Sequence, residues 1–210
     1  MIHVVTAANQ HRYHNAMEQA FRLRHRVFVE QLKWHDLARD DGREIDNFDD
    51  GHTIHMLAMK EGQVIGYQRL LPTIRPHLLS DVLPQLCEGE RPVGPQIWEW
   101  TRFCVADGHR MRGRTLNPIL SALLTGLVEW GLASGVRRVV AEMHPLHLLT
   151  LIQLHFKIAP LGLPQPIDGE DVVALTADFD ERTLRRLRDS RADATPVLEP
   201  TCAPLNRVAA

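Results

Sequence analysis

The sequence has few cysteines and no long apolar run. Its 210 residues include three cysteines, Cys87, Cys104 and Cys202, which are widely spaced and odd in number. Such usage does not support a disulfide framework and favours a reducing compartment, so we expect a cytoplasmic protein. No segment approaches the roughly 18 apolar residues of a membrane helix, and the amino terminus lacks a basic start followed by an apolar stretch. The sequence therefore predicts no membrane span and no export.

A strong net charge is also missing. Lys and Arg number 24 and Asp and Glu number 26, which leaves a formal net charge of −2 at pH 7. A nucleic-acid coat needs a strong positive field, so we expect no nucleic-acid partner, and any anionic ligand must meet a local patch. A regulator that binds DNA through the arginines between positions 182 and 188 is the rival from another class. Acidic neighbours flank those arginines and argue against it.

The length and the hydrophobic content bound the architecture. With 44% hydrophobic residues, the chain can build one full-sized core, and we predict a single domain over residues 1–191. Alanine, proline and small polar residues dominate from position 192 onward. This composition predicts a mobile tail over residues 192–210.

Hydrophobic periodicity predicts a mixed α/β order with adjacent hairpins. We expect strands over residues 2–6, 53–60, 63–71, 97–105, 136–141, 157–161 and 172–176. Helices are expected over residues 9–31, 80–86, 114–133, 146–155 and 180–191. The pair Asn117-Pro118 is a candidate cap and first turn for the helix that Gly135 ends.

One charged residue occupies a position that its helix reserves for apolar side chains. Arg24 falls on the buried stripe formed by Met17, Ala20, Phe21 and Val27. Burying an unpaired charge costs several kcal/mol or more. Arg24 therefore meets a carboxylate inside the protein or lines a cavity that receives an anion.

Three further elements carry buried-looking charges. Asp46 and Asp49 lie in a partly packed acidic loop, and both are candidate anions for Arg24. Arg69 stands among apolar neighbours in one strand, while Glu99 and Arg102 interrupt another core-like strand, residues 97–103. Spacing alone leaves two interpretations open, a structural ion-pair network and a functional site.

Metal binding finds no support in the sequence. An EF-hand starting at Asp46 would place Phe48 at its third position and Leu57 at its twelfth, and neither can ligate calcium. The pair His144 and His147 lacks a nearby third ligand. We expect no metal.

The sparse motifs together resemble one known family, the LuxI-type acyl-homoserine-lactone synthases, which make bacterial quorum-sensing signals. The matching segments, in order, are Arg24 with Val27-Phe28 and Trp34, then Glu44-Ile45-Asp46-Asn47-Phe48-Asp49, then Gly66-Tyr67-Gln68-Arg69, then Trp98-Glu99-Trp100-Thr101-Arg102-Phe103. The match is dense over roughly residues 1–105 and looser beyond. Residues 160–165 resemble a branch that includes synthases using coenzyme A thioesters.

The resemblance implies a fold like that of the GNAT-type N-acetyltransferases, a twisted mixed sheet with helices on both faces. In that fold the loop after the central strand meets the phosphate-bearing acyl donor at a helix amino terminus. Here this loop carries Arg110, Arg112 and Arg114, which suit a carrier-protein phosphopantetheine or coenzyme A. The alternative for each arginine is a solvated basic loop.

The resemblance also implies substrates and roles. The amine of S-adenosylmethionine (SAM) attacks an acyl thioester, and the methionyl carboxylate then closes onto its own γ-carbon, expelling methylthioadenosine. An α-amino group with a pKa of about 8 needs a base, and Glu99 is the candidate, acting directly or through water. No permanently bound cofactor is implied, and acyl-ACP and acyl-CoA stay open as donors. The implied SAM pocket comprises Arg24, Phe28, Trp34, Asp46, Asp49, Arg69, Arg102 and Phe103.

The sequence says less about the identity of the acyl group. Trp100, Met143 and His144 are candidates for the acyl pocket, and the absence of a threonine at Met143 and His144 argues against a 3-oxo-acyl product. Medium straight chains and branched or aryl groups stay open. An ordinary N-acetyltransferase that uses acetyl-CoA on another amine is the nearest alternative, because it would share the fold.

Overall fold

The computed structural model describes residues 1–108 and 117–200, and their contacts divide into two compact units. Among the described residues, the first unit comprises 1–69, 102–108, 117–127 and 195–200, and the second comprises 70–101 and 128–194. Three elements pass from one unit into the other. They are β3 (Gln63–Pro72), β4 (Ile97–Val105) and α3 (Pro118–Ser134).

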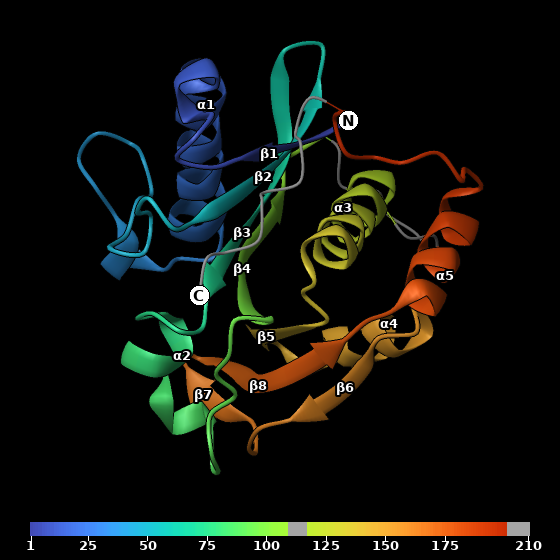
Figure 1. Ribbon diagram of the computed structural model, residues 1–210. Helices are drawn as coiled ribbons and strands as arrows, with labels where there is room; N and C mark the ends of the chain where they lie inside the picture. Colours follow the sequence, from blue (N-terminus) through green and yellow to red (C-terminus); the bar gives the residue numbers. More distant parts are fainter. Residues whose placement is uncertain (109–116, 201–210) are drawn as a thin grey trace. The chain divides into compact units, whose positions relative to one another are not determined.

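The first unit begins with β1 (Ile2–Val5), the 3₁₀ turn η1 (Gln10–Arg12) and α1 (His14–Arg24). The π-helical segment η2 (His25–Gln31), the 3₁₀ turn η3 (His35–Leu37) and β2 (Ile54–Lys60) follow. The strand order here is β1-β2-β3-β4, with β1 antiparallel to β2. In Figure 1, α1 lies along one side of β1, β2 and β3.

Successive residues of β3 in this unit face helices on opposite sides of the sheet. Tyr67 is buried in a core cluster with Ala20 and Leu23 of α1. Its neighbour Gly66 faces α3, where an added Cβ would lie 2.7 Å from a methyl carbon of Ile119. The alternation of strand side chains therefore places one helix on each face, as predicted.

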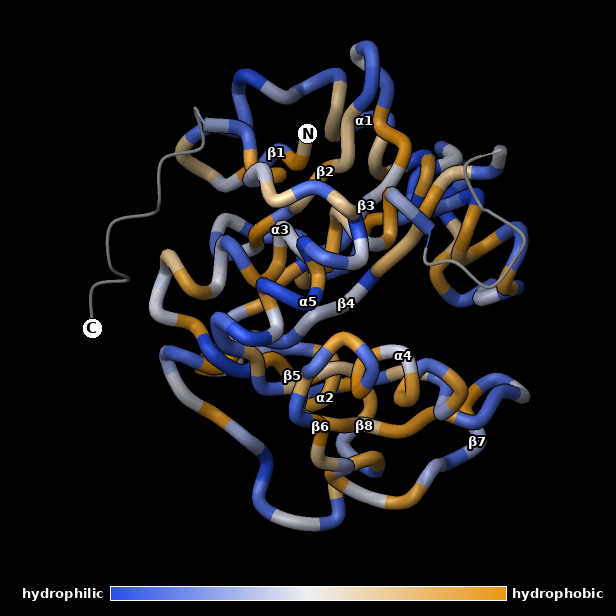
Figure 2. Tube along the Cα trace, turned by 90° about the vertical axis from the view of Figure 1, so that its right-hand side faces the viewer, coloured by the Kyte–Doolittle hydropathy of each residue, from blue (hydrophilic) through white to orange (hydrophobic). Residues whose placement is uncertain are grey.

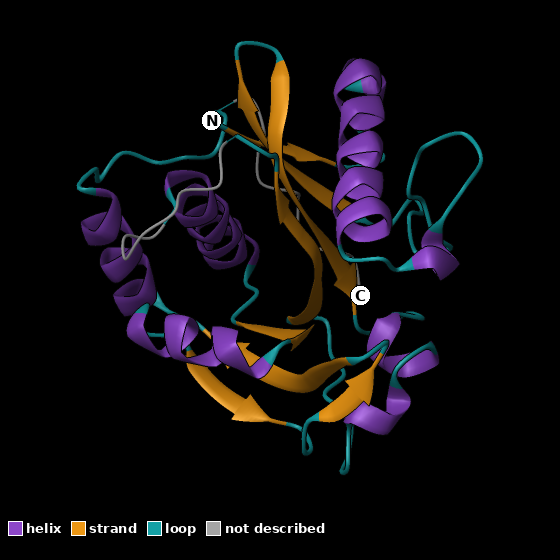
Figure 3. Ribbon diagram, turned by 180° about the vertical axis from the view of Figure 1, so that it is seen from behind, coloured by secondary structure: helices purple, strands orange, loops and turns teal. Residues whose placement is uncertain are grey.

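The second unit contains α2 (Leu78–Asp81), the 3₁₀ turn η4 (Pro84–Leu86), β5 (Arg138–Met143), the 3₁₀ turn η5 (Pro145–His147) and α4 (Leu148–Gln153). They are followed by β6 (Lys157–Pro160), β7 (Gln165–Ile167), β8 (Glu170–Asp178) and α5 (Glu181–Arg191). The strand order is β4-β5-β8-β6, and β7 pairs with β8. Figure 3 shows β5, β8 and β6 side by side, and α5 is almost entirely hydrophilic in Figure 2.

Strands β4 and β5 are parallel over a short stretch in this unit. The register joins Ile97, Trp98 and Glu99 to Arg138, Val139 and Val140. β5 continues beyond Val140 and pairs with β8 as far as Met143. The mixed α/β sheet is confirmed, and Glu99 lies at the end of the paired stretch of β4.

The prediction of one continuous helix over residues 9–31 is wrong. Tyr13, with φ −114° and ψ 17°, separates η1 from α1, and the helix widens after Arg24 into η2. There Val27, Phe28 and Val29 are all buried, which an α-helical stripe with a 3.6-residue period would not achieve. The wider turn therefore brings more apolar surface to the core than the sequence pattern indicates.

Smaller differences concern the ends of elements and the tail. β7, which contains Pro166, was not predicted, because its three residues are too few to show an alternation. Asn117 Oδ1 accepts hydrogen bonds from the first amides of α3, as predicted, and Gly135 follows α3 with φ +79°. Within the segment predicted to be a mobile tail, Val197 is buried and its carbonyl accepts a hydrogen bond from the Ile2 amide.

Candidate functional site

Six charged side chains of the first unit form a buried group that we call the ion-pair cluster: Arg24, Glu44, Asp46, Asp49, Arg69 and Arg102. Arg24 Nε donates to Glu44 Oε2 at 2.5 Å, and its Nη1 and Nη2 donate to the two oxygens of Asp49 at 2.7 and 2.9 Å. The anion that the sequence required for Arg24 is therefore a pair of carboxylates. Of the candidate anions, Asp49 is confirmed.

The remaining pairs centre on Asp46, which was the wrong candidate for Arg24. Its two oxygens accept hydrogen bonds from Arg69 at 2.6 and 2.9 Å, and Oδ2 also accepts one from Arg102 Nη2 at 2.8 Å. Arg102 reaches Glu44 as well, at 3.2 and 3.3 Å. Glu44 thus joins Arg24 to Arg102, a role that its place in the acidic motif did not reveal.

The cluster is balanced in charge, because three guanidinium groups meet three carboxylates. This balance is what allows full burial, since each charge that leaves water finds a partner of opposite sign. The side chains of Arg24 and Arg69 are 0% exposed, Glu44 is 1% and Asp49 is 2% exposed. Asp46 at 15% and Arg102 at 5% are the most exposed members, so they form the edge of the cluster that a ligand can reach.

Arg24 also contacts a buried tyrosine, which in turn contacts a buried histidine. Tyr67 Oη accepts a hydrogen bond from Arg24 Nη1 at 3.2 Å and lies 2.7 Å from His55 Nδ1. Burial favours the neutral form of His55, and a neutral imidazole can accept the tyrosine proton at Nδ1 while the tyrosine oxygen accepts from the arginine. Burial lowers the pKa of His55 to about 4, and burial likewise raises the pKa of Tyr67.

Electrostatics hold Arg24 and Asp49 in their ionised forms. Burial alone would raise the pKa of Asp49, but Arg24 and Arg69 override it and keep that pKa well below its usual value. For Arg24, burial opposes the charge, whereas Tyr67, Asp49 and Glu44 together raise its pKa. The charged state is therefore the stable one at neutral pH.

Backbone hydrogen bonds and one unusual backbone conformation position the side chains of the ion-pair cluster. Asp46 Oδ1 accepts a hydrogen bond from the Phe48 amide, and Asp49 Oδ2 accepts one from the Asp46 amide, so the acidic loop holds its own carboxylates in place. Arg102 has φ +56° in the middle of β4. A left-handed conformation at a non-glycine strand residue costs about 1–2 kcal/mol and re-aims the side chain.

Aromatic rings adjoin the exposed edge of the cluster. Phe28 and Trp34 are stacked with ring centroids 5.1 Å apart, and the Arg102 guanidinium lies 5.6 Å from the Phe28 centroid. Phe28 is 4% exposed, whereas Trp34 and Phe103 are half-buried. Predicted residues from η2, the following turn and β4 therefore meet in the first unit.

Glu99 belongs to the second unit and has a different set of partners. Its Oε1 accepts hydrogen bonds from His77 Nδ1 and the Leu79 amide, both at 2.7 Å, and its Oε2 accepts one from the Leu78 amide at 2.9 Å. Glu99, whose donors are these three groups, is therefore not the anion for Arg24. No sequence pattern pointed to His77, which lies 22 residues from Glu99 along the chain.

The predicted acyl-pocket residues also lie in the second unit. Trp100 is 8% exposed, and Met143 and His144 are half-buried at the end of β5. His144 Nδ1 accepts the Leu146 amide at 3.1 Å, so this imidazole caps the turn η5. The loop arginines Arg110, Arg112 and Arg114 lie outside the described residues.

Metal and membrane features can be assessed over residues 1–108 and 117–200. These residues contain no group of three or more His, Cys, Asp or Glu side chains that could hold a metal ion. No helix among them is long and apolar enough to cross a membrane. Neither Cys87 nor Cys104 forms a disulfide.

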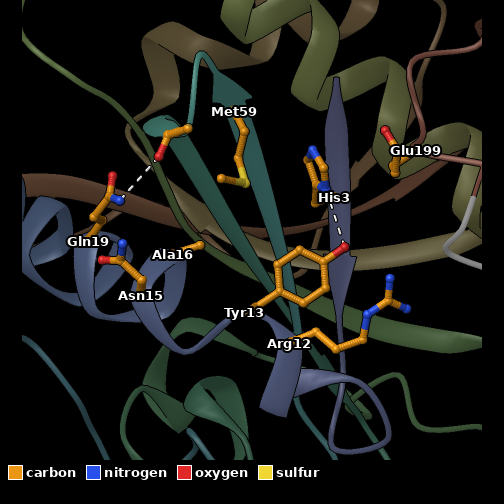
Figure 4. A pocket seen from close by; sticks show the side chains of 9 residues that line it. His3, Arg12, Tyr13, Asn15, Ala16, Gln19, Met59 and Glu199 are labelled. Atoms are coloured by element: carbon orange, nitrogen blue, oxygen red, sulfur yellow. Dashed lines mark hydrogen bonds between the residues drawn. The ribbon is translucent and has the colours of Figure 1, made fainter.

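A pocket of about 440 Å³ lies at the amino-terminal end of α1, away from the predicted residues. Figure 4 shows His3 of β1, Tyr13 before α1 and Glu199 of the carboxy-terminal segment around it. His3 Nδ1 lies 3.3 Å from Tyr13 Oη. None of the residues predicted for substrate binding lines this pocket.

Comparison with solved structures first defines the class of fold. An N-acetyltransferase from Lactobacillus plantarum matches with a TM-score of 0.54 at 19% identity, covering 84% of this chain and 97% of that chain. An acyl-CoA N-acyltransferase from Pseudomonas aeruginosa matches with a TM-score of 0.57 at 17% identity, covering 84% and 97%. The fold is that of the GNAT-type acyltransferases, as predicted.

The family model for autoinducer synthases matches residues 8–187, and the chain belongs to this family. An isovaleryl-homoserine lactone synthase of Bradyrhizobium diazoefficiens is 38% identical over 90% of this chain and 84% of its own length. An acyl-homoserine-lactone synthase of Acinetobacter nosocomialis is 30% identical, covering 83% and 98%. The protein is thus an acyl-homoserine-lactone synthase, and the ordinary N-acetyltransferase alternative is not favoured.

A solved relative carries both kinds of substrate. The CoA-dependent acyl-homoserine lactone synthase BjaI, with SAM and isopentyl-CoA, matches with a TM-score of 0.89 at 36% identity, covering 95% of this chain and 92% of BjaI. The CoA-dependent synthase MesI matches with a TM-score of 0.86 at 32% identity, covering 95% and 100%.

Proposed function

We propose that this synthase takes its acyl group from a coenzyme A thioester and that the acyl group is short and branched. The proposal rests on the structural similarity of this chain to solved synthases, which is higher for the CoA-dependent ones. The TM-scores with the CoA-dependent synthases BjaI and MesI are 0.89 and 0.86 over 95% of the chain, whereas the score with the synthase LasI is 0.71 over 81%. The relative from Bradyrhizobium diazoefficiens, 38% identical, is an isovaleryl-homoserine lactone synthase, which favours a similar product here.

SAM binds at the exposed edge of the ion-pair cluster. Asp46 offers a partly exposed carboxylate to the cationic end of SAM, and Arg102 offers a guanidinium to its carboxylate. Phe28, Trp34 and Phe103 supply aromatic surface for the adenine and the sulfonium. The buried members Arg24, Asp49 and Arg69 do not reach the ligand in this assignment, but hold the edge residues in place.

The acyl donor meets the second unit. We assign Trp100, Met143 and His144 to the wall of the acyl site, since a large ring limits chain length and a thioether fills irregular space. We assign the phosphates of coenzyme A to Arg110, Arg112 and Arg114, because guanidinium groups bind phosphate through paired hydrogen bonds.

The reaction proceeds in two steps. The deprotonated α-amine of SAM attacks the thioester carbonyl carbon, and the carbon–sulfur bond breaks to release the thiol. The methionyl carboxylate then attacks its own γ-carbon and expels methylthioadenosine. The sulfonium is already a good leaving group, so in this second step the protein mainly holds the methionyl chain in attack geometry.

A matched panel of donors tests the proposal. Purified protein and SAM are incubated with isovaleryl and hexanoyl groups, each carried both by coenzyme A and by acyl carrier protein, and lactone and methylthioadenosine are measured by mass spectrometry. We expect the highest kcat/KM for isovaleryl-CoA, with the two products in equal amounts. A higher kcat/KM for the carrier-protein thioesters would overturn the assignment of the donor, and a preference for hexanoyl would overturn that of the acyl group.

Both substrates are made inside the cell, so we place the reaction in the cytoplasm. Cys87 and Cys104 form no disulfide, which fits a reducing compartment. Fractionation of cells that express the protein from its own promoter, followed by immunoblotting, checks this. Recovery in a secreted fraction would contradict it.

A further inference from the structure

The pocket at the amino-terminal end of α1 has no role in the proposed reaction, and all of its lining residues belong to the first unit. Its volume of about 440 Å³ lies within the roughly 300–1,000 Å³ of small-molecule sites. Asn15 in the first turn of α1 is separated from Arg24 in the last turn by about 14 Å of helix, at about 1.5 Å per residue. The pocket is therefore a site distinct from the ion-pair cluster.

Two opposite charges line the pocket without meeting each other. Among residues 1–108 and 117–200, the Arg12 guanidinium has no ion pair or hydrogen bond, and neither has the Glu199 carboxylate. The amino-terminal ammonium donates to the carbonyl oxygen of Met59 at 3.4 Å rather than to Glu199. An unpaired cation and an unpaired anion in one cavity suit a ligand that carries both charges.

His3 leaves the charge of Glu199 in place. Burial lowers the pKa of this imidazole, although Glu199 opposes the shift. The ring is therefore neutral at pH 7, and its Nδ1 lies 3.3 Å from Tyr13 Oη. The backbone amide of Glu199 donates to the Ile2 carbonyl at 2.9 Å, which fixes this residue beside β1.

Arg12 lies at the positive end of a helix. α1 begins after Tyr13, whose side chain does not cap the first turn, and this turn contains no acidic residue. The first amides of a helix have no acceptor within the helix, so they add to the positive potential of Arg12. This end of the pocket favours a carboxylate.

The rest of the pocket offers apolar surface. Ala16, the ring of Tyr13 and the thioether of Met59 all line it. Figure 4 shows the Tyr13 ring between Arg12 and Glu199. Aromatic rings and thioethers both pack favourably against apolar and aromatic groups. The ligand therefore has an apolar body as well as two charges.

We propose that this pocket binds a zwitterionic amino acid with an apolar side chain. Its carboxylate meets Arg12 and its ammonium meets Glu199. Its side chain lies on Tyr13 and Met59. A nucleotide or another polyanion would bring phosphate oxygens against the Glu199 carboxylate. A wholly apolar molecule would cover both charges without pairing either, which is unfavourable.

Three matched compounds test the pairing of charges: L-phenylalanine, N-acetyl-L-phenylalanine, which lacks the ammonium, and L-phenylalaninamide, which lacks the carboxylate. Each is titrated into the full-length ¹⁵N-labelled protein, and the amide shifts give the dissociation constant and the place of binding. We expect saturable shifts at Asn15 and Ala16 with phenylalanine. The dissociation constants of the two analogues should be about tenfold higher or more, because each lacks one charge-assisted contact. Equal affinity for an analogue, or no saturable shift with phenylalanine, would overturn the proposal.

Substitutions test the place of binding. Arg12→Met and Glu199→Gln should each raise the dissociation constant of phenylalanine about tenfold or more. The control is Arg22→Met, which removes an exposed guanidinium from the same helix outside the pocket and should leave that constant unchanged. An excess of SAM should not displace phenylalanine. Displacement by SAM, or wild-type affinity in either pocket variant, would overturn the assignment to this pocket.

Discussion

The free energy of unfolding should fall in mild acid, and the buried imidazole of His55 should contribute most to the fall because its pKa is lowered furthest. His55 is 6% exposed, and burial lowers its pKa from 6.5 to about 4. The unfolded chain therefore takes up a proton between these two pH values while the folded protein does not. The stability that His55 contributes is complete above its unfolded pKa of 6.5 and is lost as the pH falls toward 4.

The size of this effect follows from the two pKa values. A difference of about 2.5 units, at 1.36 kcal/mol each, gives about 3 kcal/mol in total, most of it lost by about pH 4.5. Asp49 changes stability in the same direction, but its loss begins only as the pH falls through the ordinary carboxyl pKa of 3.8. The interval between about pH 6.5 and about pH 4.5 is therefore dominated by histidine.

The assay compares wild type with His55→Asn. Asparagine can still accept the Tyr67 hydroxyl proton but does not titrate, so the stability of the variant should change less with pH. Urea unfolding is followed by tryptophan fluorescence and circular dichroism at several values from about pH 7.5 to about pH 4.5, and the slopes are compared. Equal slopes for the two proteins would refute the assignment of the proton to His55.

Two further substitutions separate the buried and the exposed parts of the ion-pair cluster. Arg24→Met should lower the free energy of unfolding by about 3–5 kcal/mol, because it leaves buried carboxylates unpaired, while Arg22→Met, in an exposed pair, should cost less than about 1 kcal/mol in the same urea assay. Equal losses would contradict the structural role of Arg24. Asp46→Asn should raise the SAM dissociation constant about tenfold or more, measured by calorimetry, since a charge-assisted contact is worth roughly 1.5–3 kcal/mol. Unchanged SAM affinity would remove Asp46 from the binding edge.

The sequence was sufficient where a periodic pattern met a physical requirement. Strand β4 was predicted with its observed bounds, because its nine residues are mostly apolar, aromatic or β-branched. Arg24 was identified as needing an anion because it falls on an apolar stripe. Its partners were only half predicted, since the acidic loop has no period that could tell Glu44 from Asp46.

Features that depend on contacts between distant segments were not predictable. Nothing in the local pattern around His77 indicates that Glu99 will meet it. The left-handed conformation of Arg102 was also missed, because arginine has no preference for positive φ and only the surrounding contacts hold it there. The widening of η2 likewise follows from the packing of Val27, Phe28 and Val29 rather than from their propensities.

The equal numbers of acids and bases in the ion-pair cluster also limit how this sequence can diverge. Replacing Arg24, Glu44, Asp49 or Arg69 by a neutral residue leaves an odd charge in a place that water does not reach, so such single replacements lower stability. A tolerated change has to remove an acid and a base together, and their codons are far apart in the gene. Exposed pairs such as Arg22 with Glu18, at 51% and 36% exposure, carry no such restriction. We therefore expect the members of the cluster to change in pairs. An alignment of distant family members should show an acid and a base replaced together.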